Sequence, residues 1–165
     1  MHDLSSFEPA VRALAERLRA RGWRIAAAES CTGGLLAAAC TALAGSSDWF
    51  ERGFVTYSNA AKTEQLGVDA ALIAAHGAVS AETARAMALG AVARSHADLG
   101  VAITGIAGPG SAVPGKPVDT VWLALARRGD AQASASLLQL AGDRAAVREA
   151  SVGAALAALH ATAAE

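Results

Sequence analysis

The residues best suited to chemistry lie in residues 29–34, Glu-Ser-Cys-Thr-Gly-Gly. This stretch joins an apolar run of strand length, 23–28, to one of helix length, 35–44, which predicts a strand–turn–helix junction. The first N–H groups of such a helix are free, carry the positive end of the helix dipole and can stabilise an oxyanion. We therefore predict that Ser30 is a nucleophile. The alternative is that Ser and Thr here only cap the helix.

Three neighbours of Ser30 affect the same prediction. Gly33 and Gly34 lack Cβ atoms where a ligand would have to approach the backbone closely. Cys31 is a second candidate nucleophile, but no histidine lies near it in the sequence to activate its thiol. We rank Cys31 behind Ser30.

A second strand–helix junction supplies a base for such a nucleophile. Residues 53–57 are rich in β-branched and aromatic side chains and predict a strand, and Ser58 or Asn59 can cap the following helix. Lys62 then falls in the first turn, where the helix dipole disfavours a protonated amine by only ~0.3–1 kcal/mol. Burial must supply the rest of the shift. A neutral Lys62 close to Ser30 would take the hydroxyl proton during attack; the alternative is a solvated surface lysine.

Three further features are candidates for contact with the substrate. Tyr57, at the end of its strand, could relay the proton or bond the leaving group, although it could equally be a packed aromatic. Residues 104–110, which begin with Thr104 and Gly105, suggest an anion-holding loop, with a plain Gly/Pro turn as the alternative. Arg144, at the start of the last helix, could grip a phosphate; the alternative is a surface pair with its neighbouring aspartate.

Alternating strands and helices must position these residues. The pattern predicts an α/β domain, one domain over residues 1–165, with a mostly parallel sheet to which a hairpin adds an antiparallel strand. Loops at the carboxyl ends of parallel strands should converge at one edge, where ligands bind. We expect strands at 23–28, 53–57, 99–104, 121–126 and 133–140, and helices at 4–21, 33–44, 60–66, 70–75, 81–95 and 144–160.

Composition excludes several classes of protein. The net charge is −1 with no basic cluster, so duplex nucleic acid is not an expected partner. No apolar run reaches the ~18 residues of a membrane span, and no signal peptide precedes the domain, which predicts a cytoplasmic location without membrane contact. Cys31 and Cys40 on one helix would lie roughly 13 Å apart, too far for a disulfide. The spacing of cysteines and histidines predicts no metal site.

Eight ordered blocks of the sequence resemble the CinA carboxy-terminal domain family, which includes stand-alone nicotinamide-nucleotide amidases. The similarity covers about residues 5–160. The blocks are residues 29–34 (ESCTGG), 50–59 (FERGFVTYSN), Lys62, 66–68 (LGV), 76–80 (HGAVS), 104–109 (TGIAGP), 116–118 (KPV) and 142–144 (GDR).

The resemblance implies hydrolysis of nicotinamide mononucleotide, a small-molecule nucleotide, to nicotinic acid mononucleotide and ammonia, in pyridine-nucleotide recycling. It also implies a three-layer α/β/α sandwich with a mixed sheet, in a homo-oligomer that is a dimer or larger. Ser30 would be the nucleophile, Lys62 its base and Tyr57 an assisting hydroxyl, with no metal or cofactor. The substrate would be bound by Thr32, Gly33, Gly34, Thr104, Gly105 and Arg144.

Two alternatives remain open. The family usually has glycine where this chain has Asp119, and an added carboxylate near an anionic substrate would repel it. An amidase that acts on another carboxamide is therefore one alternative. The other is a non-catalytic module that binds a nucleotide or a protein partner.

Overall fold

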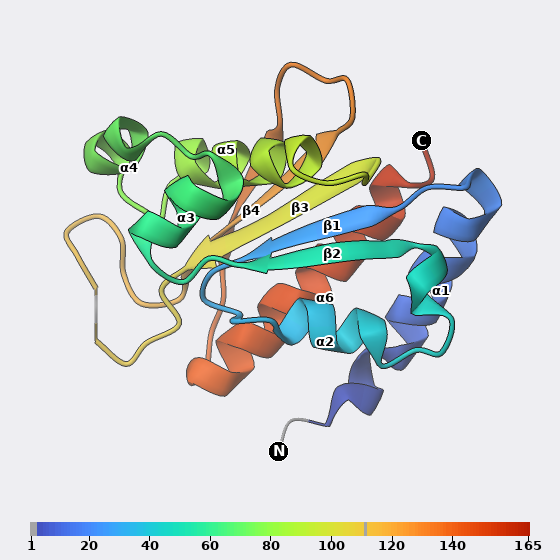
Figure 1. Ribbon diagram of the computed structural model, residues 1–165. Helices are drawn as coiled ribbons and strands as arrows, with labels where there is room; N and C mark the ends of the chain where they lie inside the picture. The colour runs from blue at the N-terminus through green and yellow to red at the C-terminus, as the bar shows by residue number, and fades with distance from the viewer. Residues whose placement is uncertain (1–2, 111) are drawn as a thin grey trace.

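The computed structural model describes residues 3–110 and 112–165, and these residues contain a five-stranded sheet in the order β2-β1-β3-β4-β5 (Figure 1). β1 pairs in parallel with β2 and β3, whereas the β3–β4 and β4–β5 pairs are antiparallel. β4 alone therefore runs against the other strands, so the predicted mixed, mostly parallel sheet is confirmed. The strands are β1 (Ile25–Glu29), β2 (Phe50–Val55), β3 (Leu99–Gly105), β4 (Thr120–Arg127) and β5 (Ser134–Gln139).

Helices lie on both sides of this sheet and make the three-layer sandwich that was predicted (Figure 1). One layer holds α1 (Glu8–Arg21), α2 (Leu35–Thr41) and α6 (Arg144–Thr162), with the short turns η1 (Leu4–Phe7) and η2 (Ser46–Asp48) beside it. The other layer holds α3 (Asn59–Leu66), α4 (Ala70–His76) and α5 (Ala81–Ala93). None of the helices in the described part of the chain combines the length and apolar character needed to cross a membrane.

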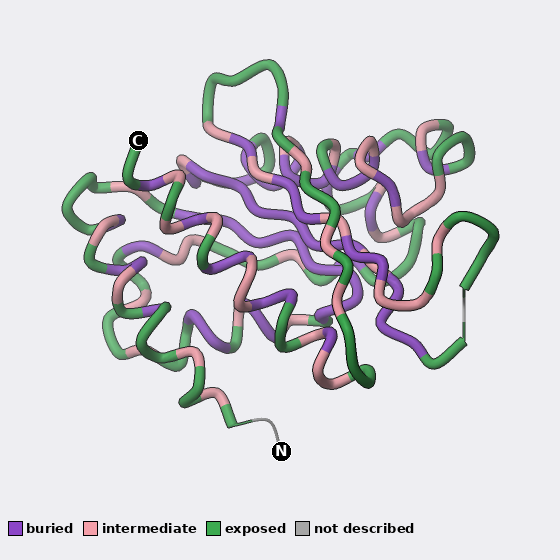
Figure 2. Tube along the Cα trace, turned by 180° about the vertical axis from the view of Figure 1, so that it is seen from behind, coloured by how far each residue is buried: buried purple, intermediate pink, exposed green. Residues whose placement is uncertain are grey.

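Two hydrophobic clusters fill the space between the sheet and its helix layers. Successive side chains of a strand point to opposite faces, so in β1 Ile25 and Ala27 join one cluster while Ala26 and Ala28 join the other. Figure 2 shows the central strands as the buried middle of the molecule. The central strands β1, β3 and β4 are covered on both faces, so a ligand can reach them only at their ends.

The element boundaries differ from the predicted ones at both junctions. The helix expected at 33–44 begins at Leu35 because Gly33 and Gly34 have φ of 56° and 97°, in the left-handed region. The strand expected at 53–57 spans Phe50–Val55, so Tyr57 lies beyond its end. The loop expected after β3 follows Gly105; its residue 111 lies outside the described residues.

Candidate active site

Ser30 and Lys62 meet at the carboxyl edge of the sheet. The Nζ of Lys62 donates a hydrogen bond to the Oγ of Ser30 at 3.0 Å and another to the carbonyl oxygen of Thr56 at 2.8 Å. Ser30 is 9% exposed and Lys62 only 1%. The predicted proximity of hydroxyl and amine is therefore confirmed, and the alternative of a solvated surface lysine is wrong.

The sequence of α3 explains why Lys62 is buried. The hydroxyl of Ser58 accepts from the backbone N–H of Ala61 at 3.0 Å and so caps the helix, and Gly67, with φ of 70°, ends it. Lys62 and Leu66 are four residues apart and form the buried face of this short helix. The position of Lys62 on the buried face of α3 therefore directs its side chain into the interior.

Burial changes the protonation of that amine. It lowers the pKa of Lys62 below the ordinary value of 10.5, because a charged ammonium loses its hydration in the interior; the nearby Cys31 thiol acts weakly in the opposite direction. A lowered pKa increases the share of neutral amine near pH 7. Only that neutral form can accept the proton of Ser30.

The cap of α2 comes from a residue that the sequence analysis did not single out. The carboxylate of Glu29, 1% exposed, accepts from the backbone N–H of Leu36 at 2.9 Å and of Ala37 at 3.0 Å. Ser30 is not needed as a cap, so its hydroxyl is available to Lys62. A buried strand that ends in a carboxylate just before a helix was the signal that could have revealed this cap.

Capping by Glu29 also changes the expected oxyanion donors. The N–H of Leu35 bonds to the carbonyl oxygen of Thr32 at 3.0 Å, and those of Leu36 and Ala37 are taken by Glu29. The prediction that the first N–H groups of this helix lie free beside Ser30 is wrong for these three amides.

A cavity of about 420 Å³ opens next to the Ser30–Lys62 pair. The turn residues Thr32, Gly33 and Gly34 do not line it, and their predicted contact with substrate stays a prediction. Thr104 is fully buried in its wall, where its hydroxyl donates to the carbonyl oxygen of Ala78 at 2.8 Å. The predicted site residues that line this cavity are Ser30, Tyr57, Lys62, Thr104, Gly105 and Arg144.

Tyr57 and Arg144 lie together at the cavity. Arg144 donates from Nη2 to the Tyr57 hydroxyl at 2.8 Å and from Nη1 to the carbonyl oxygen of Gly108 at 2.9 Å. Tyr57 is 61% exposed, so it is not the packed aromatic that was the alternative. The bridge joins the segment after β2 to the first residue of α6 across the cavity wall.

Cys31 lines the same cavity but is poorly suited to attack. Burial raises the pKa of its thiol to about 11, against the weaker opposing effects of its own backbone amide and of Arg144 and Arg148. Because the thiolate is the nucleophilic form of cysteine, a raised pKa disfavours it at neutral pH. Both Cys31 and Cys40 are buried, and they are free rather than joined in a disulfide, as their spacing predicted.

Asp119 has a structural rather than a substrate-facing position. Its φ of 76° lies in the region that glycine adopts most easily, which explains why glycine suits this position. Asp119 does not line the cavity. In residues 3–110 and 112–165, no three His, Cys, Asp or Glu side chains come together in a group that could hold a metal ion.

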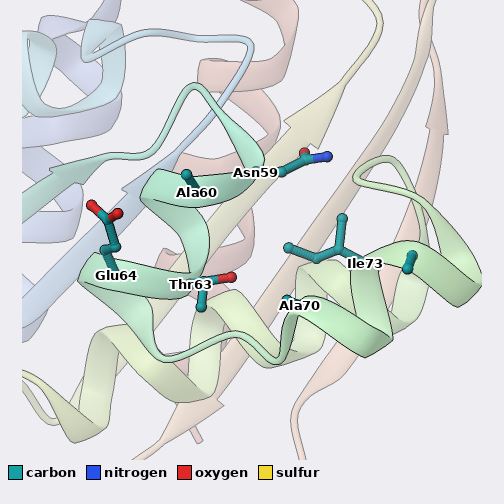
Figure 3. Close-up of a pocket in the computed structure, with 7 residues that line it drawn as sticks. Asn59, Ala60, Thr63, Glu64, Ala70 and Ile73 are labelled. Carbon is teal, nitrogen blue, oxygen red and sulfur yellow. The ribbon is translucent and has the colours of Figure 1, made fainter.

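A second cavity of about 380 Å³ lies between α3 and α4 (Figure 3). Thr63 and Ile73 line it, Glu64 stands at one end, and Asn59 is shared with the first cavity. Among its described lining residues there is no lysine or histidine to act as a base and no serine or cysteine to act as a nucleophile. The first cavity is therefore the candidate active site.

Comparison with known proteins gives the family. The sequence profile of the "CinA C-terminal domain" matches residues 8–163. A "Nicotinamide-nucleotide amidohydrolase PncC" from Pseudomonas putida is 51% identical over 144 residues, which are 87% of this chain and 88% of that protein. A protein of the same name from Enterobacter agglomerans is 51% identical over 79% of each chain.

Longer relatives and solved structures agree with this. A "CinA-like protein" from Citrifermentans bemidjiense is 56% identical over 82% of this chain but only 32% of its own length, so the chain spans about a third of that relative. The crystal structure of the competence/damage inducible protein CihA from Agrobacterium tumefaciens has a TM-score of 0.90 and 43% identity, with 94% of each chain covered. The chain belongs to the CinA C-terminal domain family.

Proposed function

We propose that this protein is an amidohydrolase that converts nicotinamide mononucleotide to nicotinic acid mononucleotide and ammonia in pyridine-nucleotide recycling. The names of two relatives that are 51% identical over most of the chain support the amidohydrolase class. The observation that carries the proposed mechanism is the 3.0 Å hydrogen bond between Lys62 Nζ and Ser30 Oγ.

In the first half of the reaction, neutral Lys62 accepts the proton of the Ser30 hydroxyl while Oγ forms a bond to the carboxamide carbon. The tetrahedral intermediate then collapses, the C–N bond breaks, and the proton passes from Lys62 to the leaving nitrogen, which departs as ammonia. Tyr57 assists this transfer through its hydroxyl. In the second half, water gives up a proton to Lys62 and attacks the ester on Ser30. The bond between the acyl carbon and Oγ then breaks, Lys62 returns its proton to Oγ, and the product leaves as the carboxylate.

The charge of the cavity supports an anionic substrate. Among the described residues that line it, the ionisable side chains besides Tyr57 and Cys31 are Lys62, Lys116 and Arg144, with no carboxylate. A phosphate that enters such a cavity meets no like charge. Asp119, which motivated the alternative of another carboxamide, is not part of that lining.

An assay of ammonia release tests the proposal. The purified protein should release ammonia from nicotinamide mononucleotide, and the Ser30→Ala and Lys62→Met variants should release it far more slowly. Free nicotinamide and the dinucleotide, assayed in parallel, show whether the mononucleotide is the preferred carboxamide. Equilibrium binding of the mononucleotide with no product after long incubation would instead favour the non-catalytic module.

A further inference from the structure

Lys116 is a second cavity lysine to which the proposed mechanism assigns no role. It comes from the loop after β3, lines the same cavity as Ser30, and is only partly exposed. Its Nζ donates to the carbonyl oxygen of His76 at 2.7 Å, at the end of α4. The absence of a side chain at Gly77 leaves room for this contact, because a Cβ at that residue would lie 2.8 Å from Lys116 Nζ.

The charge of Lys116 is not neutralised within the described residues. None of the ion pairs among them includes Lys116, and no carboxylate lines its cavity. An ammonium group has three N–H donors, and the carbonyl oxygen of His76 takes one of them. The remaining donors are available to a ligand, and an anion is the ligand that this charge favours.

Lys116 reaches the cavity from a different part of the chain than the reacting groups. Ser30 follows β1, and Lys62 lies on α3, where its Nζ donates to Ser30 Oγ and to the carbonyl oxygen of Thr56. The hydrogen bond to His76 attaches Lys116 to the α4–α5 side of the site. The cavity therefore has the Ser30–Lys62 pair on the wall supplied by β1 and α3, and an unneutralised ammonium on the wall where the chain leaves α4.

A pyridine mononucleotide has a matching arrangement, with a reactive group and an anionic group at its two ends. Its carboxamide is on the ring, and its phosphate is on the opposite side of the ribose. When the carboxamide carbon is held at Ser30 Oγ, the phosphate must lie away from the Ser30–Lys62 pair. We infer that Lys116 binds the substrate's phosphate and gives the enzyme its preference for the nucleotide over the nucleoside, an inference that rests on the function proposed above.

Ligand pairs that differ only in the phosphate test this role. Binding of the mononucleotide and of the corresponding nucleoside is measured by calorimetry on the Ser30→Ala protein, with and without Lys116→Gln. Glutamine can still donate to the His76 carbonyl but carries no charge.

Loss of the charged hydrogen bond should weaken nucleotide binding about tenfold to a hundredfold and leave nucleoside binding within about twofold. Lys116→Arg should restore most of the preference. Arg85→Gln, which removes one charge from an exposed residue of α5 outside the cavity lining, is the matched control.

The outcomes separate this inference from the proposed function. If Lys116→Gln weakens both ligands equally, or neither, Lys116 only ties its loop to α4 and the inference is wrong. If the preference for the nucleotide is lost as expected but the active protein releases no ammonia, the phosphate contact stands and the proposed reaction fails. If ammonia is released and the preference is unchanged, the reaction stands and the phosphate contact fails. Failure of the Ser30→Ala protein to bind the nucleotide overturns the phosphate contact, and ammonia release by the active protein then decides the proposed reaction by itself.

Discussion

Two strand–helix junctions of this protein are similar in sequence, but their serine side chains have different roles. β1 leads through Ser30 into α2, and β2 leads through Ser58 into α3. At the second junction the serine hydroxyl caps the helix, with Ala61 as donor at 3.0 Å. At the first junction the buried carboxylate of Glu29 caps the helix, and the serine hydroxyl faces Lys62.

The comparison teaches that a serine before a helix is free for chemistry only when another group satisfies the helix amides. A buried N–H without an acceptor lowers stability by more than a typical hydrogen bond raises it. The N–H groups at the start of a buried helix therefore need an acceptor, whichever side chain supplies it. Glu29 fills it at the first junction. Each of the following changes tests one half of this contrast, from the largest expected effect to the smallest.

Removal of the two hydroxyls should separate the junctions most clearly. Ser30→Ala should lower turnover of the mononucleotide by more than about 10³-fold, as expected for loss of a nucleophile. Ser58→Ala should retain most of the activity. Ammonia release by both variants, with circular dichroism to show that both are folded, makes the measurement. Equal losses would mean that Ser30 acts only through local structure.

Lys62→Met removes the base and keeps the volume of its hydrocarbon chain. General-base catalysis contributes about 10²–10⁴-fold, so turnover should fall within that range. The free energy of unfolding should change little, because replacement of a buried amine by an apolar group of similar size is often neutral or stabilising. Thermal unfolding beside the turnover assay checks both halves. A strongly destabilised variant would indicate that the amine is mainly a structural hydrogen-bond donor.

Glu29→Gln should be the most destabilising change at either cap. The carboxylate accepts two backbone N–H groups, but the amide has one acceptor oxygen and would turn its own N–H toward the other donor. The expected loss is about 1–3 kcal/mol in the free energy of unfolding, measured by urea denaturation. A variant as stable as the wild type would show that this cap is replaceable and would remove the reason given for a free Ser30.

Ser58→Ala should cost less stability than Glu29→Gln. Loss of a serine cap lowers stability by about 1 kcal/mol, and at this size that shifts the melting temperature by about 2–4 °C. Differential scanning calorimetry of the two cap variants gives their ranking directly. A larger loss for Ser58→Ala would reverse the comparison.

Most of the fold could be predicted from hydrophobic periods, glycines and caps. Gly22 and Gly67 end helices and Asp143 caps α6, as their residue types indicate. The identity of the α2 cap was missed because it depends on a strand-end side chain folding back over a turn. Residue type alone does not show which way that side chain points.

The site could be predicted only in part. The two strand–helix junctions predicted Ser30 and Lys62, the family resemblance implied the same roles, and the structure places the two side chains within hydrogen-bond distance. The bond between Tyr57 and Arg144 links residues that are 87 positions apart, and no local pattern encodes such a contact. The position of Lys116 at the cavity depends on the path of an irregular loop, for which sequence periodicity gives no guide.

The protonation of Lys62 connects the buried junction to activity. A depressed pKa means that the unfolded chain binds more protons than the native protein between that lowered pKa and 10.5, so stability rises with pH across this window. Activity has the same sign, because protonated Lys62 cannot accept a proton. It should fall as the pH drops through the lowered pKa.

The most direct test is an NMR titration of the lysine side chains. The chain contains only two lysines, Lys62 and Lys116, so selective labelling gives two signals, and Lys62→Met assigns them. The account predicts that the Lys62 signal titrates clearly below 10.5, at the pKa that also governs kcat/KM. A Lys62 signal that titrates at or above 10.5, with activity that does not follow it, would contradict the claim that a neutral Lys62 activates Ser30.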